Sequence, residues 1–288
     1  MLSFSIKASG ATALLGLLTA MPATASTFTF STGTPDGLIA TASRPGTGAP
    51  FEIESADDFT LTSPTSITSA TFTGLLTGTT PIVGKVVVEI YRIFPKDSDA
   101  TRTPNVPTRA NSPSDVEFDG RDSAVAGDLI ATTQVVKSSF TANNSVQPGG
   151  IHLPNFQTGG NGGVTGEEVE FDITFTRPFS LPADHYFFVP QVQVTGGDFL
   201  WLSAPKTIPA PADLQSWTRD QMLDPDWLRV GQDIVGGTPF PTFNAAFSLV
   251  GEIPEPASLS LLGAALAGMG LLGWRRDRRN QSAARTLT

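Results

Sequence analysis

Short apolar segments alternate along most of this chain with clusters of Gly, Pro, Asn, Thr and Ser, a pattern that is typical of all-β proteins. The clearest segment is residues 169–177, in which apolar residues alternate with polar or charged ones. Because successive side chains of a strand point to opposite faces, this period of two predicts a strand with one face in a core. The chain is therefore expected to bury its core between sheets.

About ten segments are expected to be strands. They are residues 26–30, 38–43, 51–61, 67–76, 84–94, 129–136, 169–177, 185–194, 199–202 and 243–250. Residues 84–94 are apolar on both faces, which predicts a strand inside a sheet. Residues 213–223 are the one candidate helix, with Asp213 as its N-cap and Pro211 just ahead of it. The expected fold is a jelly-roll-like β-sandwich whose strand order stays open.

The composition limits the possible partners of this sandwich. Residues 26–252 carry 25 Asp and Glu against 12 Lys and Arg, which gives a net charge of −13. Such a surface repels nucleic acid and anionic membranes and attracts cations. The chain has no Cys, so its core must hold it without disulfides. We expect one domain at residues 26–252 and no nucleic-acid partner.

The first 25 residues have the parts of a secretory signal peptide. Lys7 supplies the positive charge, residues 11–20 are the apolar segment, and Ala23 and Ala25 are the small residues of a cleavage motif. We predict export through the Sec machinery and cleavage by signal peptidase, so that the mature chain begins at Ser26. The apolar segment is too short for a transmembrane helix.

A second targeting segment lies near the C-terminus. Pro254, Glu255 and Pro256 precede an uncharged apolar segment at residues 257–274. An arginine cluster follows, consisting of Arg275, Arg276, Arg278 and Arg279. The apolar segment is at the short end of the about 17–25 residues that cross a membrane as a helix. Because arginines hold their end of such a helix in the cytoplasm, we predict a separate transmembrane helix with everything before Pro254 outside.

The order of these parts resembles the PEP-CTERM sorting signal, here at residues 253–279 and followed by a tail at residues 280–288. The resemblance implies recognition by an exosortase, a membrane-embedded cysteine protease or transpeptidase, and cleavage near Pro254, Glu255 and Pro256. The protein would be held only transiently in the inner membrane of a Gram-negative bacterium. It would then be released to the cell envelope or to an extracellular polysaccharide matrix.

A long connection at residues 95–128 concentrates carboxylates, and calcium binds to such oxygen ligands on loops. The candidate ligands are the carboxylates of Asp97, Asp99, Asp115, Asp119 and Asp122, and Glu117 lies in the same loop. Their spacing is not that of an EF-hand. Structural calcium is one interpretation, and a solvated acidic loop is the other. Asp57 and Asp58 form a second acidic pair, for which the solvated interpretation is favoured.

Two tryptophans, Trp217 and Trp227, lie in an irregular segment among charged residues. Exposed aromatic rings beside carboxylates bind sugars, whereas buried rings would close one end of the sandwich. We favour the second interpretation, in which the two rings act as a lid over the core.

Catalytic motifs are absent from the sequence. The chain has only His152 and His185, and neither lies in a zinc-binding or nucleophile motif. A glycosidase needs only two carboxylates, which an acidic chain always provides, so this class stays open. The favoured hypothesis is an exported, non-enzymatic protein of the cell envelope or extracellular matrix, with structural calcium as the one cofactor considered. The alternatives are a calcium-dependent carbohydrate-binding module and an extracellular glycan hydrolase.

Overall fold

The computed structural model describes residues 26–46, 51–148, 151, 155–207, 213–254 and 269. Ser26–Pro254 form one compact unit. The predicted signal peptide lies outside the described residues, and so does the predicted transmembrane helix apart from Met269.

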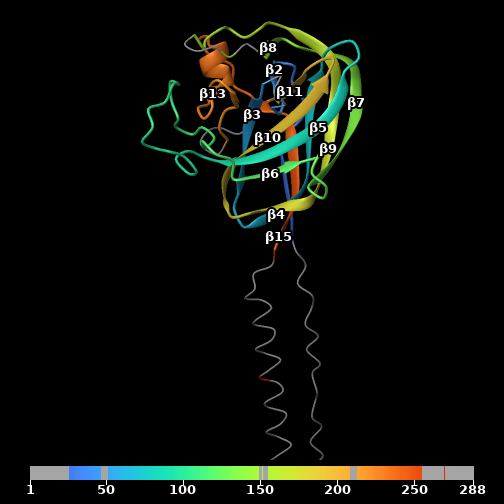
Figure 1. The fold of residues 1–288 in the computed structure, drawn as a ribbon, viewed down its shortest axis with the longest axis vertical. Helices are drawn as coiled ribbons and strands as arrows, with labels where there is room; N and C mark the ends of the chain where they lie inside the picture. The colour runs from blue at the N-terminus through green and yellow to red at the C-terminus, as the bar shows by residue number, and fades with distance from the viewer. Residues whose placement is uncertain are drawn as a thin grey trace, which may run out of the picture. The chain divides into compact units, whose positions relative to one another are not determined.

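The described residues form an all-β sandwich of two sheets, as the sequence predicts (Figure 1). The central path of the nine-stranded sheet is β1 (Ser26–Ser31), β15 (Phe247–Ile253), β4 (Thr65–Leu76), β11 (Phe199–Ala204), β2 (Ile39–Ala42) and β8 (Asn144–Val146). Three further strands attach to this path, namely β14 (Asn244–Ala245), β9 (Val164–Leu181) and β7 (Leu129–Ala142).

The six-stranded sheet carries the site described below. Its order is β13 (Leu228–Arg229), β12 (Trp217–Asp220), β3 (Ile53–Leu61), β10 (Asp184–Thr195), β5 (Ile82–Arg92) and β6 (Asp119–Asp122). Figure 1 shows β5 in cyan between β10 and β6, which confirms the prediction of an interior strand.

The main core lies between the two sheets and is rich in phenylalanine. Phe72 stacks on Phe171 with ring centroids 4.8 Å apart, and Phe188 stacks on Phe247 at 5.1 Å. The alternation predicted for residues 169–177 is confirmed, because the apolar members of this segment of β9 are at most 3% exposed. Aromatic pairs of this kind contribute beyond the area that they bury, which suits a chain without disulfides.

The helix predicted at residues 213–223 is wrong. The structure has β12 there, and its residues pair with β3. Trp217 and Arg219 face one side of the sheet and Thr218 faces the other, as in any strand. Pairing with β3 therefore decides the conformation of this segment, against the helix-start signal at Asp213. The helical turns that the structure does have in this region form a π-helix, η1 (Val230–Val235), after β13.

Candidate functional site

The outer face of the six-stranded sheet, which points away from the main core, carries a cluster of charged side chains. Directly paired residues of adjacent strands share a face. The register opposes Arg219 of β12 to Glu54 of β3, and Glu89 of β5 to Gly120 of β6. Core residues such as Ile90 occupy the alternate positions of the same strands. Residues far apart in the sequence therefore meet on one surface.

Arg219 is the centre of this polar network, and its side chain is only 6% exposed. It forms a bidentate ion pair with Glu54, in which Nη2 lies 3.0 Å from Oε1 and Nε contacts Oε2. Nη2 also donates to Tyr91 Oη at 2.9 Å, and Tyr91 donates to Glu54 Oε1 at 2.6 Å. Burial alone would lower the pKa of Arg219, but Glu54 outweighs it and raises the pKa, so the guanidinium stays charged.

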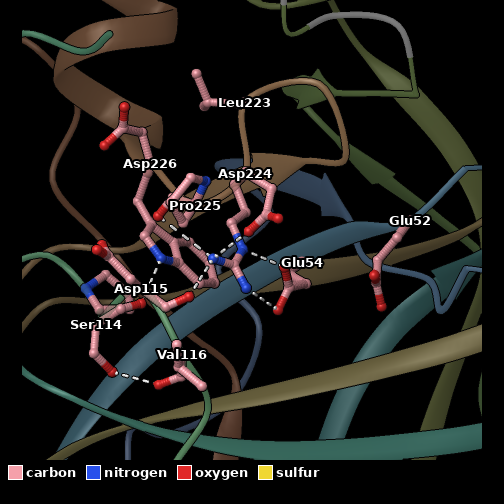
Figure 2. A network of polar contacts seen from close by, with 12 residues as sticks. Glu52, Glu54, Ser114, Asp115, Val116, Leu223, Asp224, Pro225 and Asp226 are labelled. Atoms are coloured by element: carbon pink, nitrogen blue, oxygen red, sulfur yellow. Dashed lines mark hydrogen bonds and ion pairs between the residues drawn. The ribbon is translucent and has the colours of Figure 1, made fainter. Parts of the chain in front are cut away.

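Two loops close over this ion pair. Arg219 Nη1 donates to the backbone oxygen of Asp115 at 3.3 Å, and it lies 3.0 Å from Oδ1 of Asp224. Figure 2 shows Glu54, Asp115, Asp224 and Pro225 converging from separate segments, with Glu52 set apart from them. The network therefore ties the long loop before β6 and the turn after β12 to the sheet.

Trp217 and Trp227 belong to the cover of the same face, and each is 1% exposed. The ring of Trp227 lies 4.3 Å from the Arg219 guanidinium carbon, and its Nε1 donates to Ser114 O at 3.1 Å. Both rings pack in a second apolar cluster with Leu214 and other residues of this face. As placed, neither ring offers a face to a sugar, which argues against the carbohydrate role considered for them. Both rings are buried, as the lid hypothesis expects, but they cover the outer face of the six-stranded sheet and not the end of the main core.

A cleft of about 520 Å³ opens beside the network, on the same face of the sheet. Its lining includes six carboxylates, those of Glu52, Glu89, Glu117, Asp119, Asp122 and Asp128. The two cations of the lining are already paired: Lys85 lies 3.0 Å from Asp122, and Arg121 lies 2.6 Å from Asp119. The cleft therefore presents mainly hydrogen-bond acceptors and an excess of negative charge.

The carboxylates of this region affect one another's protonation. Burial, and after it the charges of Glu54 and Glu117, raise the pKa of Glu89 well above its usual range. Burial and Glu54 also raise the pKa of Glu52. Because like charges in a partly desolvated site disfavour ionisation, a cation that entered the cleft would lower both pKa values again.

The five aspartates predicted as calcium ligands are engaged with other groups. Asp97 pairs with Arg92, Asp115 with Arg109, Asp119 with Arg121, and Asp122 with Lys85. Asp99 accepts hydrogen bonds from Thr101. Among the described residues, no group of three or more His, Asp or Glu is arranged to hold a metal ion. The loop is thus neither a formed calcium site nor simply solvated, since most of these carboxylates pair with cations.

Calcium is accordingly expected to leave the stability of the protein unchanged. The measurement is the thermal unfolding midpoint with excess calcium and with a chelator, because a ligand that binds only the folded state raises this midpoint. A shift of several degrees that chelation reverses would restore the calcium hypothesis for this loop.

The predicted sorting residues lie at the end of the described unit. Ile253 ends β15 and pairs with Ser26, the first residue of β1. Pro254 is the last described residue of this unit, and Glu255, Pro256 and the arginine cluster lie outside the described residues, as do Ala23 and Ala25. In the part of the chain that the structure describes, no helix is long and apolar enough to cross a membrane.

A family model of the PEP-CTERM protein-sorting motif matches residues 252–279. This chain carries a PEP-CTERM sorting motif. The motif marks an exosortase substrate, and PEP-CTERM proteins are exported to the cell surface of Gram-negative bacteria. The match confirms the resemblance seen in the sequence and begins one residue before the predicted boundary. No curated protein and no solved structure matches this chain.

No sequence pattern singled out the residues of the network and of the cleft wall, namely Glu52, Glu54, Glu89, Tyr91, Gln191 and Arg219. One signal was present, because Glu89 is the one charged residue within the apolar run of residues 86–91, and a charge in such a run is unusual without a partner or a function. A second was the run of acidic residues at alternate positions of residues 51–61, which share one face of β3. That face is covered, since Glu54 is 5% and Asp58 2% exposed.

Proposed function

We propose that this protein is an exported, non-enzymatic component of the cell envelope or of an extracellular polysaccharide matrix. In this proposal a jelly-roll-like sandwich is the cargo, and the C-terminal segment is its temporary anchor. The signal peptide at residues 1–25 directs the chain to the Sec machinery and is removed before Ser26. The apolar segment at residues 257–274 then holds the chain in the inner membrane until an exosortase cuts near the Pro-Glu-Pro triplet.

One observation carries the proposal: the sorting motif matches residues 252–279, a range that begins in the last two residues of β15, the final strand of the sandwich. The end of β15 is paired with β1, so cleavage near Pro254 would leave the folded unit with both of its terminal strands in place. The carboxylates of the candidate site are held in ion pairs or in a cleft without a recognisable catalytic set, which supports a structural role over catalysis.

The test is the substitution Glu255→Ala in the native host. We expect the full-length protein to stay in the membrane fraction, whereas the wild type appears in shortened form in the medium or envelope. Immunoblots of the fractions, with antibody against the sandwich, measure the ratio of the two forms.

The control is Asp172→Ala, which also removes one exposed carboxylate, on β9 and outside the matched residues 252–279. This variant should be released as efficiently as the wild type. Normal release of the Glu255→Ala protein would contradict processing at the triplet, and so would normal release from cells that lack the exosortase.

A further inference from the structure

The cleft on the six-stranded sheet has acceptors that form no ion pair with the cations of the described residues. Glu52, Glu89 and Glu117 form no ion pair with any described Lys, Arg or His, although the other carboxylates of the lining do. Glu117 and the neighbouring Phe118 are exposed at the rim, whereas Glu89 lies deeper. Tyr91 Oη is 3.2 Å from Glu89 Oε2, but its single proton is given to Glu54 at 2.6 Å. The acceptors without a cationic partner are thus concentrated on three glutamates in one cleft.

A buried amide in the same wall points to a ligand independently of the acidic residues. Gln191 is 0% exposed and lines the cleft, and its Nε2 donates to Glu52 Oε1 at 3.3 Å. That bond fixes which way the amide is turned, because a carboxylate accepts only from the nitrogen. Its Oε1 is buried and has no hydrogen-bond partner among the described residues. Unsatisfied buried acceptors destabilise a fold, so this one calls for a donor.

Gly120 allows the glutamates to approach each other. A Cβ at this position would lie 3.2 Å from Glu117 Oε2 and 3.6 Å from Glu89 Cγ. Both side chains therefore approach the same backbone position, and a residue larger than glycine there would crowd them.

We propose that this cleft binds an organic cation, an amine or guanidine with several N–H donors. This inference goes beyond sorting and matrix association. A volume of about 520 Å³ suits a small molecule, and charged N–H groups match acceptors that are anionic or carbonyl oxygens. The described carboxylates are not arranged to hold one metal ion, which favours an extended ligand whose separate N–H groups contact separate carboxylates.

The test is isothermal titration of the full-length protein in detergent with spermidine as the probe. We expect saturable binding of one spermidine per chain, weakened by added salt because the attraction is electrostatic. The substitution Glu117→Gln should weaken binding about tenfold, the effect of losing one charged hydrogen bond. Glu117 is exposed, so this variant is expected to fold normally.

The control variant is Asp172→Asn, which removes one negative charge from an exposed position of β9 in the other sheet. It should leave the affinity within about twofold, as expected for a distant screened charge. Diacetylspermidine has the same chain with fewer positive charges and should bind more weakly than spermidine. The proposal is overturned by the absence of saturable heat, or by equal losses in the two variants. Calcium binding more tightly than spermidine, and lost in Glu117→Gln, would overturn it in favour of a metal site.

Discussion

Replacing Arg219 by methionine should destabilise the sandwich by about 3–5 kcal/mol, since one partner of a buried ion pair would be left without the other. The side chains of Arg219 and Glu54 are 6% and 7% exposed. Methionine fills much of the arginine volume, so the loss measures the charge and not a cavity. Tyr91 would also lose a hydrogen-bond donor, and the loops near Asp115 and Asp224 would lose their tie to the sheet. Denaturant unfolding followed by tryptophan fluorescence measures the change.

The matched control for this prediction is Arg177→Met. Arg177 pairs with Asp128 at 2.9 Å, but its side chain is 54% exposed, so its loss should change the unfolding free energy by about 0–1 kcal/mol. The double variant Arg219→Met, Glu54→Leu should recover much of the lost stability, because no buried charge then lacks a partner. Equal effects of the two single arginine substitutions would show that the network contributes no more than a surface pair.

The second large effect concerns Asp57, which is 0% exposed at the edge of the main core. Its Oδ2 accepts from the backbone nitrogen of Ala245 at 2.7 Å, and its Oδ1 has no partner among the described residues. Burial, followed by the charges of Asp58 and Asp213, raises the pKa of Asp57 well above 3.8, and Lys206 only partly offsets them. The folded state therefore favours the protonated form.

The sign of the pH dependence follows from this shift. A carboxyl with a raised pKa contributes stability that is fully present below the unfolded value of 3.8 and is lost as the pH rises through the folded value. Asp57→Asn removes that loss, because the amide oxygen keeps the bond from Ala245 without a buried charge. We expect the variant to be more stable than the wild type by about 1–3 kcal/mol near pH 8, and the gain to shrink toward about pH 4.

The neighbouring Asp58→Asn variant provides the comparison. Asp58 accepts from the backbone of Leu214 at 2.8 Å and contacts His185 Nε2 at 2.5 Å, so its carboxylate is fully used. Asp58→Asn should therefore lower the free energy of unfolding. A destabilised Asp57→Asn protein at pH 8 would contradict the assignment of Asp57 as a buried, unsatisfied acid.

The sequence predicted the long strands well because their own residues carry the signal. The alternation at residues 169–177 and the apolar run at residues 84–94 appear as β9 and β5. Short strands such as β6 and β12 were missed, since their residues have no distinct period and owe their conformation to the partner strand. Local sequence contains little information about such pairing.

The candidate site could not be predicted for a related reason. Glu54, Glu89 and Arg219 come from three strands, and only the register of the sheet brings them together. Asp57 and Asp58 are adjacent in the sequence, and from that alone we expect a solvated acidic pair. Adjacent residues of a strand face opposite ways, and here both faces are covered, so each carboxylate is buried in a different environment.

The place of β15 between β1 and β4 has a mechanical consequence. If the C-terminal segment holds the chain as proposed, tension at Pro254 would act along β15, which is antiparallel to both neighbours. The hydrogen bonds of an antiparallel pair lie perpendicular to the strands, so a force along β15 acts in shear on the bonds to both neighbouring strands at once. Such a force does not break the bonds one after another. Under the proposed anchoring, β15 would therefore resist such tension without separating from the sheet.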